Sequence, residues 1–60
     1  MTKLWRVTSG QFCGAFVVDA DKDRVILAAP FLARRVMGRT ETQALQAVMR
    51  RPGTKVEQVK

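Results

Sequence analysis

The first part of the chain contains three short runs of apolar and polar residues that are typical of β-strands. The runs cover residues 4–8, 12–18 and 24–28, and the segments between them, 9–10 and 19–23, have the composition of turns. Short turns between successive strands favour antiparallel pairing of each strand with the next. The first half of the chain therefore predicts a three-stranded antiparallel sheet.

From Pro30 onward the pattern changes to that of two short helices. Pro30 suits the first turn of a helix that continues over residues 31–37, and Gly38 is a natural helix terminator. The second helix is expected over residues 41–51. It begins at residues 40–43, Thr-Glu-Thr-Gln, which match a capping box in which two side chains bond two backbone N–H groups.

Residues 54–59 return to a mixture of valines and polar side chains, which predicts a last strand. A chain of 60 residues is long enough for one hydrophobic core only, so we expect residues 1–60 to form a single domain. The predicted fold class is α+β. It is a small three- to four-stranded antiparallel sheet with two short helices on one face, in the order βββααβ.

The second expected strand has apolar residues on both of its faces. Side chains alternate along a strand, which places Phe12, Phe16 and Val18 on one face and Cys13 and Val17 on the other. Two short helices can cover only one face of such a sheet. The other face is either covered by a partner protein or by a second copy of the chain in a homodimer, or it stays exposed because its residues are small.

Positive charge is concentrated in the second part of the chain. Residues 1–23 contain three cations and three anions, whereas residues 24–60 contain eight cations and two anions, so the net charge of +6 belongs to the latter. A basic surface of this kind favours an anionic partner. The same charge is also compatible with solubility alone.

We expect the anionic partner to be nucleic acid, held by the two helices. Arginine and lysine bind phosphate oxygens and arginine also reads guanine, whereas glutamine reads adenine. Phe31 shares a helix face with Arg34 and Arg35, where an aromatic ring can stack on bases. The plainer alternative is that Phe31 packs into the core and that the two arginines are solvated. The candidate nucleic-acid-binding residues are Arg34, Arg35, Arg39, Gln43, Gln46, Arg50, Arg51 and Lys55.

The composition argues against catalysis. The chain has no histidine and no tyrosine, and its one cysteine, Cys13, lies among apolar strand residues as an inert small hydrophobe would. The triplet Asp19, Asp21 and Asp23 lacks the glycine and glutamate that a calcium loop needs, so it predicts a hairpin turn. We expect a protein that is not an enzyme and that has no cofactor and no bound metal.

The sequence also predicts a cytoplasmic protein that does not enter a membrane. Residues 1–6 are charged and lack the continuous apolar segment of a signal peptide. The longest apolar stretch, residues 25–32, is far shorter than the roughly 20 residues that span a bilayer.

About half of the chain resembles small proteins from phages and actinobacteria. The resemblance is carried by the run Phe12…Gly14-Ala15-Phe16-Val17-Val18…Arg24-Val25…Ala28-Ala29-Pro30-Phe31-Leu32…Gly38. Those proteins have a phenylalanine, small residues and Val-Val, then a short turn, Val-x-x-Ala-Ala-Pro-Ile-Leu and a later glycine. The resemblance implies a phage or mobile-element origin. An alternative function is therefore that of a phage-type protein-binding module, an inhibitor or adaptor of a host protein, which uses the apolar sheet face.

Overall fold

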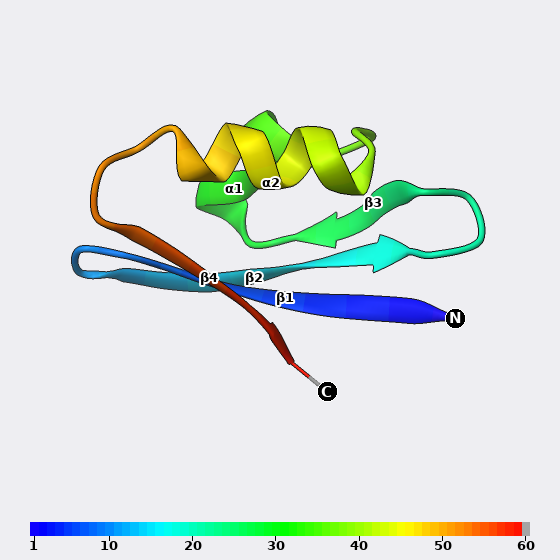
Figure 1. Cartoon of the computed structure of the whole chain (residues 1–60), viewed down its shortest axis with the longest axis horizontal. Coiled ribbons are helices and arrows are strands. Elements are labelled where there is room, and N and C mark those ends of the chain that lie inside the picture. Colours follow the sequence, from blue (N-terminus) through cyan, green and yellow to red (C-terminus); the bar gives the residue numbers. More distant parts are fainter. Residues whose placement is uncertain (60) are drawn as a thin grey trace.

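The computed structural model describes residues 1–59, which form four strands and two helices (Figure 1). The predicted α+β class is confirmed, with all four strands in one antiparallel sheet. Along the chain the elements are β1 (Thr2–Ser9), β2 (Phe12–Asp19), β3 (Arg24–Ala28), α1 (Pro30–Val36), α2 (Glu41–Met49) and β4 (Thr54–Val59).

Within the sheet the strands lie in the order β3-β2-β1-β4. The first three strands are joined by short turns, and β4 returns from the helices to pair with the free edge of β1. Gly10 supplies a positive φ of 58° in the first turn, and Asp23 supplies one of 52° in the second. Glycine adopts this conformation without strain, and aspartate is among the few other residues that tolerate it. Turn chemistry thus fixes the pairing of β1, β2 and β3.

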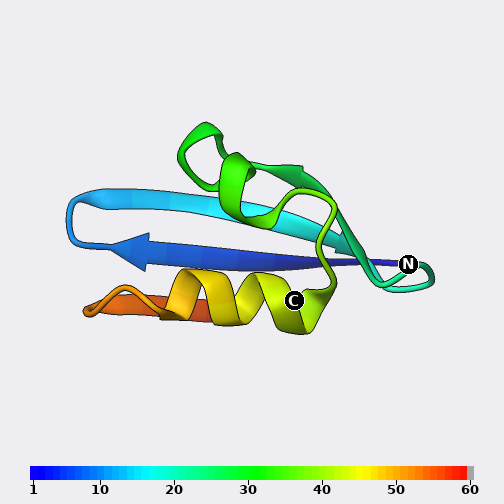
Figure 2. The ribbon, with the colours of Figure 1, turned by 90° about the horizontal axis from the view of Figure 1, so that it is seen from above.

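The core lies between the sheet and the helices, which Figures 1 and 2 show together on one side of the sheet. Alternate residues of β1, β2 and β3 point into this layer and meet the apolar side of each helix. The buried residues are Val7, Phe16, Val18, Val25, Leu32, Val36, Ala44 and Val48.

The second helix begins where the capping box was predicted. The hydroxyl of Thr40 accepts a hydrogen bond from the Gln43 N–H at 3.2 Å, and the Gln43 side-chain oxygen accepts one from the Thr40 N–H at 3.3 Å. The helix ends at Met49, two residues before the predicted end at Arg51. Arg51 precedes Pro52, and the proline ring disfavours a helical conformation in the residue before it.

On the far side of the sheet, no element within residues 1–59 covers the strands (Figure 1). The register aligns one aliphatic residue from each strand across this face, in the order Val59, Leu4, Val17 and Leu27. The exposed fractions are 38% for Val59, 39% for Leu4 and 65% for Leu27. We call this uncovered side of the sheet the open face and these four residues the aliphatic row. A partner protein or a second copy of the chain at this face stays a prediction.

Cys13 also lies on the open face, as the alternation of side chains along the strand predicted. Its thiol is exposed. Its side chain points away from the helices because it alternates with Phe12 and Gly14, and no second layer lies on that side of the sheet within residues 1–59.

Candidate nucleic-acid interface

Four arginines line a groove between the two helices. Arg34 and Arg35 come from α1, Arg39 from the connection to α2, and Arg50 from the residue that follows α2. Ala47 is the fifth lining residue, and its small side chain leaves the groove open, with a volume of about 300 Å³. We call this hollow the arginine groove.

The connection that carries Arg39 is held against the edge of the sheet. The Val25 N–H donates to the Arg39 carbonyl at 2.9 Å, and the Gly38 N–H donates to the Val25 carbonyl at 3.2 Å. The guanidinium of Arg24 donates to the Gly38 carbonyl at 2.8 Å. Arg24 therefore serves the fold, and its contact with the backbone helps to position Arg39 beside the groove.

Each of the three aspartates at the β2–β3 turn has a hydrogen-bond or ion-pair partner within the fold. Asp19 accepts hydrogen bonds from the Asp21 and Lys22 N–H groups at 3.0 and 3.4 Å, as expected for an aspartate that bonds its own turn. Asp21 pairs with the N-terminal ammonium group at 3.2 Å. Asp23 accepts from the Glu41 N–H at 3.1 Å, so it supports the first turn of α2.

The two glutamates are paired as well. Glu41 lies 3.4 Å from the Lys3 ammonium, and Glu57 lies 3.3 Å from the Arg6 guanidinium. The five acidic side chains therefore all have partners within the fold. Within residues 1–59, by contrast, six arginines form no ion pair. Arg24 donates to the Gly38 carbonyl instead, and the other five are Arg34, Arg35, Arg39, Arg50 and Arg51.

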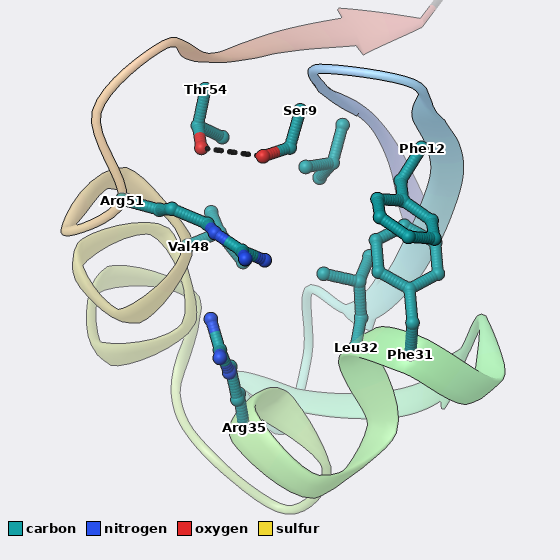
Figure 3. A pocket seen from close by; sticks show the side chains of 9 residues that line it. Ser9, Phe12, Phe31, Leu32, Arg35, Val48, Arg51 and Thr54 are labelled. Atoms are coloured by element: carbon teal, nitrogen blue, oxygen red, sulfur yellow. Dashed lines mark hydrogen bonds between the residues drawn. The ribbon is translucent and has the colours of Figure 1, made fainter.

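A pocket opens beside the groove, at the end of the core nearest the β1–β2 turn. Its volume is about 100 Å³, and its aliphatic part is formed by Val7, Leu32 and Val48. Figure 3 shows Arg35 and Arg51 pointing toward one another at one side of this hollow. Arg35 lines both the groove and the pocket, which makes the two hollows neighbours.

On its other side the pocket is bounded by two aromatic rings, those of Phe12 and Phe31 (Figure 3). Their centroids lie 5.7 Å apart and their planes are tilted by 35°. Gly14 lies beneath Phe31, because a Cβ at this position would come within 2.5 Å of the ring. Phe31 is neither fully buried in the core nor fully exposed to solvent. It packs on Gly14 and Phe12, and 39% of its surface is exposed.

Two hydroxyl groups complete the pocket where β1 meets β4. The Thr54 hydroxyl donates to the Ser9 hydroxyl at 3.2 Å (Figure 3). A hydroxyl has one donor and two acceptor positions, so each group keeps hydrogen-bonding capacity for a ligand. The Phe/Arg pocket, lined by Val7, Ser9, Phe12, Phe31, Leu32, Arg35, Val48, Arg51 and Thr54, thus combines apolar, cationic and neutral polar surface.

The structure divides the candidate residues identified from the sequence into groups. Arg34, Arg35, Arg39 and Arg50 meet in the arginine groove, and Arg51 joins Arg35 at the Phe/Arg pocket.

The other three candidates lie outside both hollows. Gln43 and Gln46 line neither one, and the side-chain oxygen of Gln43 is engaged in the capping box. Lys55 pairs in register with Thr8 and points to the open face of the sheet.

Phe12, Ser9 and Thr54 were not recognised from the sequence as site residues. Alternation correctly places Phe12 on the same face as Phe16, but it does not show that the helices leave the end of that face uncovered. Ser9 and Thr54 are opposite one another only because β4 pairs with β1. To predict these two residues as neighbours in a site, one would have to know the register between β1 and β4.

Comparison with known proteins gives no match: no family model, no curated protein and no solved structure matches the chain. The resemblance to phage and actinobacterial proteins therefore stays a prediction. No helix within residues 1–59 has the length and the apolar character needed to cross a membrane.

Proposed function

We propose that this protein is a small, basic, non-catalytic module that binds nucleic acid through its helix layer. The observation that supports this function best is the arginine groove, which is lined by four arginines and by no acidic residue of the described part of the chain. Guanidinium groups match the geometry of phosphate oxygens and can donate two parallel hydrogen bonds to them. A phosphodiester backbone is the ligand that supplies such oxygens in a regular series.

Unpaired charge is the second point in favour of this function. The five arginines that line the two hollows form no ion pair within residues 1–59, which raises the electrostatic free energy of the unbound protein, while the acidic side chains are paired elsewhere. A bound phosphate backbone would neutralise these arginines and release its condensed counterions. Four to five such contacts correspond to a slope of about −4 in a plot of log K against log salt for duplex DNA, and of about −3 for a single strand.

A titration with labelled nucleic acids tests the proposal. Fluorescence anisotropy is measured with single-stranded and duplex DNA and RNA at about 50 and 200 mM salt, a range over which phosphate contacts weaken strongly. The double variant Arg34→Gln/Arg50→Gln removes two groove charges. The double variant Lys22→Gln/Lys55→Gln removes two charges outside the groove and serves as a control with the same net charge.

We expect the groove variant to bind more weakly than the control and to have a shallower salt slope, reduced by about 1.5. If both variants lose affinity equally, net charge and not the groove explains the binding. If the unsubstituted protein does not bind any of the four probes at low salt, the proposed function is wrong.

A second candidate function, binding of a protein at the open face, is favoured by the aliphatic row. The molecule exposes 4407 Å², whereas a folded monomer of 6.7 kDa exposes roughly 3,900 Å². The excess is consistent with a face that is buried in a complex. The partner would be a host protein, as for a phage-type inhibitor or adaptor, or a second copy of the chain.

Analytical ultracentrifugation distinguishes these two partners. A homodimer sediments at twice the monomer mass, and the variant Leu4→Ser/Leu27→Ser returns it to the monomer. A monomer at high protein concentration rules out the second copy. Binding at this face should respond little to salt, since few charges are involved, unlike binding in the groove.

A further inference from the structure

Phosphate binding in the arginine groove does not account for the size and the chemistry of the neighbouring Phe/Arg pocket. Its volume is about 100 Å³, which is smaller than an apolar cavity of roughly 150 Å³ that encloses benzene in another protein, so only part of a planar ring fits inside it. The pocket is open at its mouth, so one planar ring can enter with its edge still reaching solvent. A base that is stacked within a duplex cannot enter in this way.

The two sides of the pocket suit the two halves of a nucleotide. Phe12 and Phe31 offer ring surfaces on which a base can stack, and stacking does not depend on the identity of the base. Arg35 and Arg51 point into the opposite side, where the phosphate attached to that base would lie (Figure 3). Neither arginine is paired with a carboxylate within residues 1–59.

Polar groups for the edge of the ring are present as well. The hydroxyls of Ser9 and Thr54 lie 3.2 Å apart at the pocket and retain free acceptor and donor positions. They can bond to the oxygen and nitrogen atoms at the edge of a base or to a sugar hydroxyl. Because Arg35 lines both hollows, a strand that lies along the groove can place one of its bases in the pocket.

We infer that the Phe/Arg pocket holds one unstacked base of a single-stranded nucleic acid, with the phosphate of that nucleotide between Arg35 and Arg51. This inference rests on the proposed function and adds to it a preference for single strands over duplexes. The aromatic pair distinguishes a nucleotide from a simple anion, which would need the two arginines alone.

Three probes of the same length separate the contribution of the base from that of the backbone. They are labelled oligothymidine of about twelve nucleotides, within the usual range for small single-strand-binding folds, a strand built from abasic units, and a duplex. We expect oligothymidine to bind about tenfold to a hundredfold more tightly than the abasic strand, which is the range for stacking of one base on an aromatic side chain.

The variant Phe12→Ala tests the pocket without disturbing the core, since 56% of the Phe12 surface is exposed. We expect this variant to lose most of the difference in affinity between oligothymidine and the abasic strand, with the affinity for the abasic strand unchanged. Phe12→Trp keeps an aromatic surface and should retain tight binding. Leu27→Ala removes an exposed apolar side chain from the open face and serves as the matched control, with no change for any probe.

The outcomes distinguish this inference from the proposed function. If oligothymidine and the abasic strand bind equally, and Phe12→Ala weakens neither, the pocket does not hold a base, although the groove still binds phosphates. Equal weakening of both strands by Phe12→Ala also overturns the inference, because a stacking residue cannot act on a strand without bases. If neither strand binds at low salt, the proposed function itself fails.

Discussion

The helix layer and the open face of the sheet differ in whether their arginines are paired with carboxylates. On the open face, Arg6 and Glu57 lie opposite each other in register and form an ion pair at 3.3 Å. The arginine groove is lined by four arginines and Ala47, and no carboxylate within residues 1–59 lines it. Like charges that lie close together repel each other, so this arrangement is not one that stabilises the isolated fold.

The difference separates what holds the molecule together from what is available to a partner. Stability comes from the apolar layer between sheet and helices, in which Phe16, Val18 and Val36 are fully buried. The groove arginines lie outside this layer and are exposed. Substitutions in the groove should therefore change binding, while substitutions in the layer or at its ends should change stability.

The largest effect is expected when all four groove arginines are replaced by glutamine. The affinity for labelled single-stranded DNA at low salt should fall more than about a hundredfold, because four phosphate contacts are lost together. Thermal unfolding followed by circular dichroism should show unchanged or slightly higher stability, because repulsion among the four cations is removed. A variant that unfolds at a much lower temperature would show that the arginines serve the fold, and the comparison would fail.

Gly14 offers the next largest effect, this time on stability. In Gly14→Ala the new Cβ would lie 2.5 Å from the Phe31 ring and 2.9 Å from the Ala29 Cβ, so the start of α1 has to shift. Overpacking of this kind costs about 1–3 kcal/mol in the free energy of unfolding. Urea unfolding followed by the fluorescence of the single tryptophan, Trp5, measures it.

Cys13→Ala is the control for Gly14→Ala, because it changes the neighbouring position on the open face. It should leave the free energy of unfolding unchanged within about 0.5 kcal/mol, as is usual for surface substitutions. Equal destabilisation by the two variants would mean that Phe31 does not depend on Gly14, and that the pocket is less defined than the structure shows.

Local signals in the sequence predicted most of the fold. The bounds predicted for β3 and β4, residues 24–28 and 54–59, agree with the structure, as does the capping box at Thr40. These features depend on residues close together in the chain, such as turn residues and alternating valines, which act over a few positions. The α+β class followed from adding them together.

The candidate site was only partly predictable, because it depends on contacts between distant segments. A count of basic residues cannot show that Arg50 faces the groove while Arg51 turns to the pocket, or that Lys55 lies on the opposite face of the sheet. Those positions follow from where α2 ends and from the pairing of β4 with β1. The role of Gly14 beneath Phe31 likewise appears only when α1 is placed on β2.

A smaller effect is expected at Thr40, a polar residue of the helix layer that serves the fold. Thr40→Ala removes the hydroxyl that accepts from the Gln43 N–H, and loss of such a cap costs about 1 kcal/mol in the free energy of unfolding. Affinity for nucleic acid should stay the same, because Thr40 does not line the groove. Thr40→Ser, which retains the hydroxyl, is the matched control and should keep most of the stability.

The smallest effect is expected from Glu57→Gln, which breaks the ion pair of the open face. Both side chains are more than half exposed, at 65% for Glu57 and 54% for Arg6, so the pair contributes no more than about 0.5 kcal/mol to stability. Urea unfolding should barely change, yet the variant leaves Arg6 unpaired on the open face. If the affinity of Glu57→Gln for single-stranded DNA equals that of the unsubstituted protein, an unpaired arginine alone does not create a binding site. Tighter binding would mean that any added positive charge strengthens the complex, and that the groove has no special role.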